Sequence, residues 1–350
     1  MLLQARVLTA AARLAVLLLA TPLGGCYYLH VTAGQLDLNA RRVPIESVLS
    51  DPAASPGLRD RLAYVNEVRL FAAAELGLPD NGSYTQYADL GRSHVVWNVF
   101  AAPEFDVAPK RWCLPVAGCV AYRGYFDESK ARRTATGLVR RGYDVHVSPV
   151  AAYSTLGHFA DPVLSSMLRY DDVTLAALLF HELAHQVAYA PGDSDFSEAF
   201  ATVVEFEGTR RWLEARGRDG ELEGFLEARR RFFAVADLMV AARAGLAGLY
   251  ASGLSPEAMR EAKARAFESL REDYRKLRAG WNPGGASMDG LLEGELNNAR
   301  LGAISTYHRC VPGLTAELER IGRDLEAFYA LARRLAAGPA VERQVACDAG

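Results

Sequence analysis

The chain has 350 residues and half of them are hydrophobic, which is enough for a full buried core in one large domain or two small ones. Its formal net charge is −3 and its isoelectric point is near 6.2, so the overall charge gives no support for a nucleic-acid partner. Basic residues are scattered along the second half, where pairs such as Arg210 and Arg211 are typical of a solvated helix face.

The N-terminus has the pattern of a targeting segment. Arg6 and Arg13 precede a short apolar stretch at residues 14–20, and Leu-Gly-Gly-Cys follows, ending at Cys26. The stretch is too short to span a membrane. Leu-Gly-Gly-Cys resembles a bacterial lipobox, which implies cleavage before Cys26 and lipid on its thiol; an ordinary secretory signal is the alternative. Because Tyr27 is not Asp, we expect an anchor at the outer membrane, facing the periplasm.

The domain boundaries follow from this interpretation. Residues 1–25 are predicted to be the signal peptide, residues 26–55 an extended tether, and residues 56–340 the folded domain.

Four cysteines remain beyond the signal, and an even number in an oxidising compartment suggests two disulfides with three possible pairings. Cys113 with Cys119 would close a short loop, and Cys310 with Cys347 would tie down the C-terminal tail. Zinc binding by these cysteines is the alternative, although their spacings do not fit a zinc ribbon or finger.

The first half of the folded domain mixes helix and strand patterns. Apolar periodicity predicts a helix over residues 56–77, ending at Gly77 and Pro79. A second helix is expected at about 127–141. Three runs rich in β-branched and aromatic residues, bounded by Pro and Gly, predict strands within residues 93–102, 117–126 and 143–150.

The second half is almost wholly helical in pattern. One helix should run from an N-cap at Asp171 or Asp172 to about residue 189. Ser255 before Pro256 starts another helix, and residues 279–287 form a loop. Two further helices are expected at about 288–308 and 315–337. The predicted fold is α+β, with the sheet-containing part at about 82–160, a helix pair at about 171–216 and a helical part at about 220–337.

The segment His-Glu-Leu-Ala-His-Gln, residues 181–186, has the spacing of a metal site. On a helix, His181 and His185 lie on one face and can bind one metal ion, while Glu182 is placed to act on water as general base. The third ligand must come from elsewhere, with Glu198 as the best candidate. Glu205, two helical turns further, competes with it. A His2Glu set with an open fourth position favours Zn2+.

These residues also carry a resemblance. His-Glu-x-x-His followed by Glu-x-Phe-Ala-x-x-x-Glu resembles the gluzincins, which include thermolysin and the large zinc aminopeptidases. More closely, the chain is similar to a family of bacterial lipoproteins assigned as zinc aminopeptidases. This match runs from about residue 26 to residue 335 and is carried by blocks at residues 153–164, 181–186, 197–205 and 297–307.

The resemblance implies a gluzincin-like core with Glu198 as the third ligand and Glu205 as an acid beside the histidines or the substrate. Two departures stand out. The gap between His185 and Glu198 is short, so the turn between the two helices must be tight. Ser197 stands where the related pattern usually has Asn.

The resemblance also implies a substrate cleft. Residues 150–159 correspond to an edge strand that pairs with substrate backbone, which makes Tyr153 and Gly157 candidate contacts. Tyr307 is the first candidate donor to the oxyanion and Tyr153 the second. Asn297 and Asn298 are candidate substrate contacts.

An aminopeptidase must in addition bind a free amine, and residues 153–157 contain no acid. Glu205, Asp161 or another acid must then supply this contact.

The sequence thus predicts a zinc-dependent peptidase, preferably an aminopeptidase, that acts on peptides and is held at the membrane by lipid on Cys26. A zinc endopeptidase and a cell-wall peptide hydrolase use the same metal chemistry and stay open as alternatives. A third alternative is a metal-bound scaffold without catalytic activity, but the presence of Glu182 argues against it.

Overall fold

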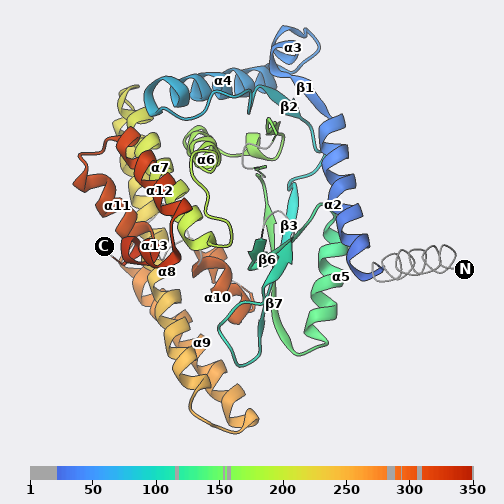
Figure 1. Ribbon diagram of the computed structural model, residues 1–350, viewed down its shortest axis with the longest axis vertical. Helices are drawn as coiled ribbons and strands as arrows, with labels where there is room; N and C mark the ends of the chain where they lie inside the picture. Colours follow the sequence, from blue (N-terminus) through green and yellow to red (C-terminus); the bar gives the residue numbers. More distant parts are fainter. Residues whose placement is uncertain are drawn as a thin grey trace, which may run out of the picture.

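The computed structural model describes residues 22–114, 118–152, 154–155, 159–281, 288–292, 294–305 and 310–348. The α+β fold class is confirmed: small sheets lie in the first half of the chain, and the second half is helical (Figure 1). The strands are β1 (Arg42–Pro44), β2 (Gln86–Ala88), β3 (Val96–Pro103), β4 (Trp112–Leu114), β5 (Gly118–Val120), β6 (Tyr122–Tyr125), β7 (Tyr143–Val150) and β8 (Val163–Leu164).

The helices alternate with these strands and then follow one another to the C-terminus. They are α2 (Pro22–Ala40), α3 (Ile45–Ser50), α4 (Pro56–Leu76), α5 (Glu128–Val139), α6 (Asp172–Ala184), α7 (Ser194–Glu214), α8 (Asp219–Tyr250), α9 (Pro256–Ala279), α10 (Asn298–Ser305), α11 (Val311–Arg320), α12 (Leu325–Ala337) and α13 (Ala340–Cys347), with short 3-10 helices η1 (Met167–Arg169) and η2 (Asp289–Leu291).

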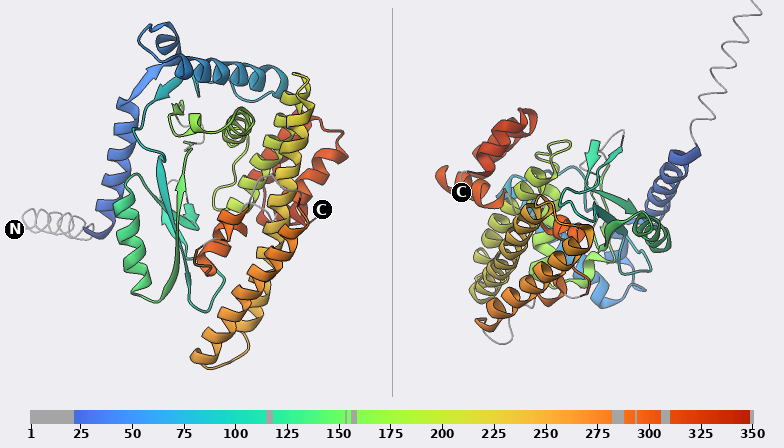
Figure 2. Two further views of the ribbon diagram at one scale, coloured as in Figure 1. Left: turned by 180° about the vertical axis from the view of Figure 1, so that it is seen from behind. Right: turned by 90° about the horizontal axis from the view of Figure 1, so that it is seen from below.

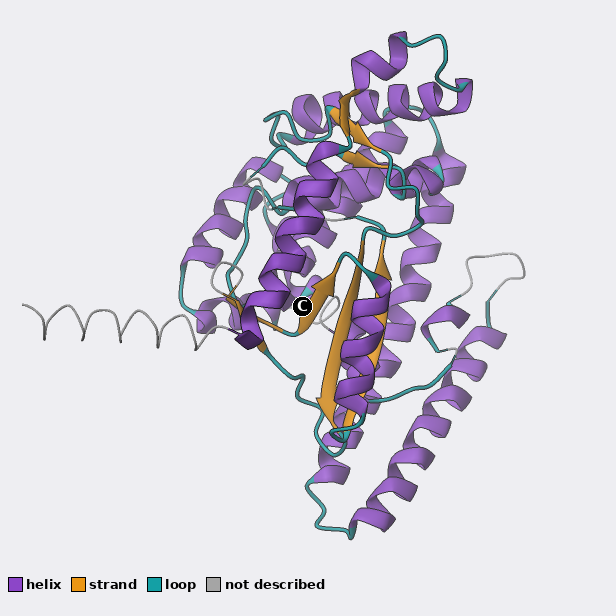
Figure 3. Ribbon diagram, turned by 90° about the vertical axis from the view of Figure 1, so that its right-hand side faces the viewer, coloured by secondary structure: helices purple, strands orange, loops and turns teal. Residues whose placement is uncertain are grey.

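The main sheet has the antiparallel order β6-β3-β7. Its strands lie side by side among the helices (Figure 3). Side chains alternate across the central strand: Trp97, Val99 and Ala101 pack with residues of α5, whereas Phe100 and Ala102 pack with residues of α10. One face is therefore covered by α5, and the other is turned toward the helical half.

The principal hydrophobic core lies where α4, α6, α7, α11 and α12 meet. Its largest fully buried side chains include Phe180 from α6, Trp212 from α7 and Phe328 from α12. Burial of one such aromatic side chain contributes about 1.5–3 kcal/mol. The helix pair α6–α7, which carries the candidate metal ligands, is thus anchored in the principal hydrophobic core.

Several local predictions are confirmed. Helix α4 begins after Ser55, whose side chain accepts a hydrogen bond from Leu58 N, and it ends at Gly77, where φ is +64°. The strands β3, β5, β6 and β7 and helix α5 lie where the patterns predicted them. Both expected disulfides are present: Cys113 pairs with Cys119 across β4 and β5, and Cys310 at the start of α11 pairs with Cys347 of α13.

Other predictions are wrong. Residues 26–55 are not an extended tether, because α2, β1 and α3 lie there and bury Leu38 and Ile45 in the core. The helix expected at 288–308 is also interrupted: among the described residues, η2 covers Asp289–Leu291 and α10 covers Asn298–Ser305, with non-helical residues between them. The single helix expected at 315–337 is two helices, α11 and α12. They are separated where Gly322 and Arg323 both adopt positive φ, and Asp324 caps the second.

The expected strand at 150–159 is also wrong for the residues that the structure describes. Strand β7 ends at Val150, and within 150–159 only that residue is in a strand. The chain turns there because Asp161 accepts a hydrogen bond from Thr155 N, while Thr155 Oγ1 accepts one from Phe159 N. Strand β7, at one edge of the main sheet, is the edge strand that leads into this region.

Helices α8 and α9 form a long pair on the side of the molecule opposite α2 (Figure 2). Val235, Met239 and Leu246 of α8 pack with Phe267 and Leu270 of α9 in a second hydrophobic cluster. By length and composition alone, α8 is the one helix among the described residues that could cross a membrane, and 22% of its most apolar window is buried in the protein.

Candidate metal centre

Helices α6 and α7 bring the candidate ligands together. Asp171 caps α6 by accepting a hydrogen bond from Thr174 N. His181 lies in the last turn of α6 and His185 is its C-cap, so the helix ends at the motif and not at about residue 189 as predicted. Helix α7 then returns along α6 and presents Glu198 in its second turn.

The turn between the two helices is held by side chains. Asp193 caps α7 by accepting from Phe196 N at 3.2 Å, and it also accepts from Arg343 Nε at 2.6 Å. Ser197 Oγ donates to Asp193 O at 2.9 Å and accepts from Ala190 N at 3.1 Å. Ser197 therefore fixes the tight turn that the short spacing requires.

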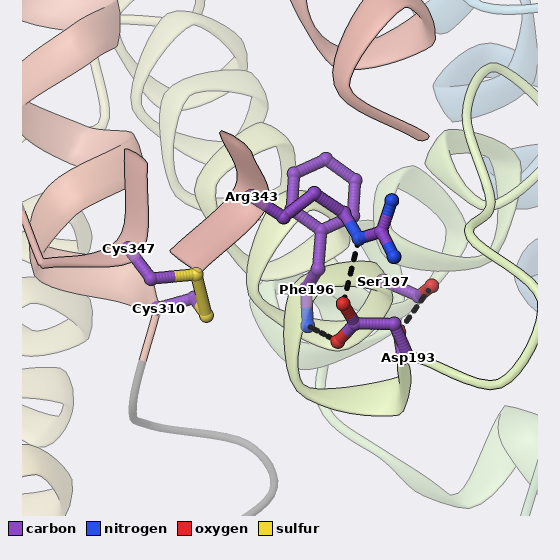
Figure 4. The surroundings of a disulfide bond; sticks show 6 residues. All are labelled: Asp193, Phe196, Ser197, Cys310, Arg343 and Cys347. Carbon is purple, nitrogen blue, oxygen red and sulfur yellow. Dashed lines mark hydrogen bonds and ion pairs between the residues drawn. A yellow bond between two sulfur atoms is a disulfide. The ribbon is translucent and has the colours of Figure 1, made fainter. Parts of the chain in front are cut away.

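Arg343 lies on α13, whose end is tied to the start of α11 by the Cys310–Cys347 disulfide (Figure 4). The C-terminal segment thus reaches back to the helix cap that positions Glu198.

Three candidate ligand atoms converge at the ends of these helices. His181 Nε2 lies 3.2 Å from His185 Nε2 and 3.3 Å from Glu198 Oε2, and His185 Nε2 lies 3.7 Å from Glu198 Oε2. A tetrahedral site with metal–ligand bonds of about 2.0–2.1 Å has ligand–ligand distances of roughly 3.3–3.4 Å. The three side chains are mostly buried and together could hold a metal ion.

Glu205 lies on the other side of the His181 ring. Its Oε2 is 3.0 Å from His181 Nδ1, and its Oε1 forms an ion pair with Arg229 of α8. The Arg229 guanidinium lies over the rings of Phe206 and Phe225, at 4.9 Å and 5.2 Å from their centroids. A carboxylate at Nδ1 fixes the ring orientation and leaves Nε2 directed at the ligand cluster.

The acids of the site differ in their electrostatics. Burial raises the pKa of Glu182, and the charges of His181 and His185 only partly offset that effect. Burial also acts to raise the pKa of Glu198, but His185 and His181 outweigh it and hold that pKa well below its usual range. Glu198 is therefore a carboxylate, whereas Glu182 is an acid whose proton affinity is increased.

The family model described as "Putative aminopeptidase" matches residues 26–347. The chain belongs to this family. No curated protein and no solved structure matches it. Membership of an aminopeptidase family supports a peptidase-like function, and the His-His-Glu cluster is a group of side chains that can hold a metal ion.

Three tyrosines that the sequence did not single out lie near the acids. The pKa of Tyr122 is raised far above its usual value, mainly by burial and next by the charge of Glu198. Burial and then Glu198 raise the pKa of Tyr189, and burial and then Glu182 raise that of Tyr84. Tyr122 comes from β6 and Tyr84 from the loop before β2, so only the folded chain brings them to α6.

Some predicted substrate residues have structural positions instead. Asn298 Nδ2 donates to Pro103 O at 3.0 Å and to Glu104 O at 3.1 Å, while its Oδ1 accepts from Tyr250 OH at 2.8 Å. Asn297 Nδ2 donates to Val145 O at 3.0 Å. Both asparagines are buried, and their hydrogen bonds fasten α10 to the sheet. Their side-chain amides are therefore already paired within the protein and not left for a substrate.

The remaining predicted contacts, Tyr153, Gly157 and Tyr307, lie outside the described residues.

Proposed function

We propose that the protein is a zinc-dependent aminopeptidase in which His181, His185 and Glu198 hold the metal ion. One observation carries this proposal: three ligand atoms from two helices meet within 3.2–3.7 Å, next to a partly buried glutamate in the general-base position. Family membership supports the aminopeptidase activity.

The donor set suits zinc. Two neutral imidazole nitrogens and one carboxylate oxygen match the ligands of catalytic zinc sites, which keep a fourth position open. When bound there, Zn2+ would polarise the substrate carbonyl and lower the pKa of water.

Glu182 performs the proton transfers in this proposal. It takes a proton from the attacking water and later delivers a proton to the leaving amine. A partly buried glutamate with a raised pKa suits both steps, because its proton affinity is closer to that of the groups it serves. Glu205 acts through His181 by holding the ring at Nδ1. Tyr307 stays the predicted donor to the oxyanion.

The proposal includes a location. Two disulfides are typical of proteins that fold outside the cytoplasm, which supports export of this chain. The Leu-Gly-Gly-Cys motif supports a lipid anchor on Cys26, with the protein in the periplasm at the outer membrane. Peptides would be its substrates.

The replacement Glu182→Gln tests the function. The variant should keep its metal and its fold but lose hydrolysis of a panel of unblocked peptides by about 1000-fold or more, because no side chain then accepts the water proton. Purified muropeptides in the same panel would distinguish a cell-wall substrate. Activity within a few fold of the wild type would remove Glu182 from the mechanism.

A further inference from the structure

Helices α2 and α5 lie beside each other and share an outer surface that is apolar on one helix and basic on the other (Figure 1 and Figure 2). Contacts between the two helices fix this arrangement. His30 of α2 accepts a hydrogen bond from Phe126 N at 3.1 Å through Nε2, and its Nδ1 lies 3.0 Å from Lys130 Nζ of α5. The apolar and the basic side chains are therefore held on one part of the molecule.

The residue that follows the predicted lipid site at Cys26 is packed against the main sheet. Tyr27 OH donates to Gly124 O of β6 at 3.1 Å, and the Arg123 guanidinium lies 3.7 Å from the centroid of the Tyr27 ring. A lipid on Cys26 would thus have no flexible tether between it and the folded domain. The surface beside the start of α2 would then lie at the membrane.

The outer side of α2 is an apolar stripe. Residues 27–36 contain no Asp, Glu, Lys or Arg. Leu29, Ala33 and Leu36 have the i, i+4, i+7 spacing of one helix face and are all exposed, Leu29 by 72% and Leu36 by 62%. Tyr28 beside them is 42% exposed. A continuous exposed apolar stripe of this kind is typical of a surface that binds a partner.

Helix α5 and the turn after it are strongly basic. Residues 127–141 contain five basic and two acidic residues, which gives a net charge of +3 in a chain whose total net charge is −3. All five basic side chains are exposed: Lys130, Arg132, Arg133, Arg140 and Arg141. This segment is therefore a local concentration of positive charge.

Three of these arginines are available to an external anion. Ala131 and Leu138 are the buried side of α5, and the spacing places Arg133 and Arg140 on the opposite side of the helix. Within the residues that the structure describes, no acid forms an ion pair with Arg133, Arg140 or Arg141. An exposed helix face whose charge is not balanced by its own acids favours an anionic partner.

Helix α9 shows what a solvated helix face of this protein looks like. Arg265 lies 3.8 Å from Glu261, and Arg275 lies 2.6 Å from Glu268. The exposed basic residues of α9 thus have acids beside them on the same helix. The basic face of α5 differs, which argues against the interpretation that it serves only to keep the helix in water.

We propose that the surface formed by α2 and α5, the α2–α5 surface, docks on a membrane that contains anionic phospholipids. Leu29 and Leu36 enter the boundary between headgroups and acyl chains, as the apolar face of an interfacial helix does. Arg133, Arg140 and Arg141 bind the phosphate groups of the lipids. A membrane is the occupant that fits both halves of the surface, because it offers an apolar layer next to a layer of negative charge.

This inference goes beyond the proposed peptidase function and gives the protein a fixed orientation. Helix α5 covers one face of the main sheet, and helices α6 and α7 lie on the other side of that sheet (Figure 1). Docking through α2 and α5 would therefore turn the candidate metal centre away from the lipid, where it can meet peptides in solution.

The test measures binding to vesicles by co-sedimentation, for the mature chain, residues 26–350, with Cys26→Ser so that no lipid is attached. This reference chain should bind vesicles of phosphatidylglycerol and phosphatidylethanolamine at least about 100-fold more strongly than vesicles of phosphatidylcholine. Raising the salt from about 0.1 M to about 1 M, which shortens the Debye length from about 10 Å to about 3 Å, should remove most of this preference.

Three sets of replacements in the reference chain assign the binding to the α2–α5 surface. Changing Arg133, Arg140 and Arg141 to glutamine should weaken binding to the anionic vesicles by about 100-fold, because each basic residue near an anionic surface contributes a factor of about 5. Leu29→Gln together with Leu36→Gln should weaken it by about 10-fold or more, because less apolar surface enters the lipid. The matched control makes the same change in charge on the exposed face of α9 and should bind like the reference chain; its replacements are Arg265→Gln, Arg275→Gln and Arg278→Gln.

The proposal can fail in four ways. Equal binding of the reference chain to both kinds of vesicle would overturn it, and so would an equal loss in the α9 control, which would show an effect of total charge alone. Unchanged binding after the two leucine replacements would also overturn it. So would a dimer in solution that the leucine replacements dissociate, because the stripe would then belong to a second copy of the chain. None of these results bears on peptide hydrolysis, which is measured separately.

Discussion

Replacement of Glu205 by glutamine should weaken metal binding without removing a ligand. Glu205 Oε2 lies 3.0 Å from His181 Nδ1, and its side chain is only 8% exposed, so solvent screens this contact little. Loss of a carboxylate that hydrogen-bonds a metal-binding histidine typically lowers metal affinity by about 10–100-fold, or about 1.4–2.7 kcal/mol. The glutamine keeps the size of the side chain but not its charge, so we expect a loss of some tens of fold.

The assay is zinc titration in competition with a chelator of known affinity, for the wild type and two variants. Glu207→Gln is the matched control. Glu207 is on the same helix and 4% exposed, but it pairs with Arg210 and Arg211 rather than with a histidine. The Glu207→Gln variant should keep the zinc affinity of the wild type even if its free energy of unfolding falls. Wild-type affinity in Glu205→Gln, or an equal loss in both variants, would refute this role of Glu205.

Two further predictions concern stability. Removal of the Cys310–Cys347 disulfide by a double replacement with serine should lower the free energy of unfolding by about 4 kcal/mol, and removal of Cys113–Cys119 by only about 2 kcal/mol, because the first closes the longer loop. Urea unfolding measures both, and the reverse order would contradict the argument. Burial, aided by the charge of Arg300, lowers the pKa of His146 to about 4. As the pH falls, His146 therefore takes up its proton near pH 6.5 in the unfolded chain but only near pH 4 in the folded protein. The contribution of this residue to the free energy of unfolding should be full above about pH 6.5 and fall by up to about 3 kcal/mol toward pH 4. In His146→Gln, the free energy of unfolding should fall less between pH 6.5 and pH 4 than in the wild type. The same pH dependence in the variant and the wild type would contradict this role of His146.

Much of the candidate metal centre could be predicted because its signals are local. The i, i+4 spacing places His181 and His185 on one helix face, and the helix-breaking residues Pro191 and Gly192 mark the turn that returns Glu198. Helix α4 was equally predictable, since Ser55 and Gly77 are strong cap residues at its two ends.

The rest depends on contacts between distant segments. The loop that carries Tyr84 is placed by a hydrogen bond from Gln186 to the neighbouring Ser83 and by one from Tyr84 N to Asp161 O, which no local pattern encodes. Residues 26–55 have weak periodicity, and they fold because β1 pairs with β2 and Ile45 enters the core. The break between α11 and α12 was marked by Gly322, but apolar periodicity continued across it and concealed it.

The most direct test of the account is the metal content of the mature chain, produced as residues 27–350 and purified without chelators. Elemental analysis should find about one zinc per chain in the wild type, and much less in Glu198→Gln after the same purification, because that variant lacks one of three protein ligands. No metal in the wild type, and no uptake when zinc is added, would contradict the metal centre and with it the proposed enzyme.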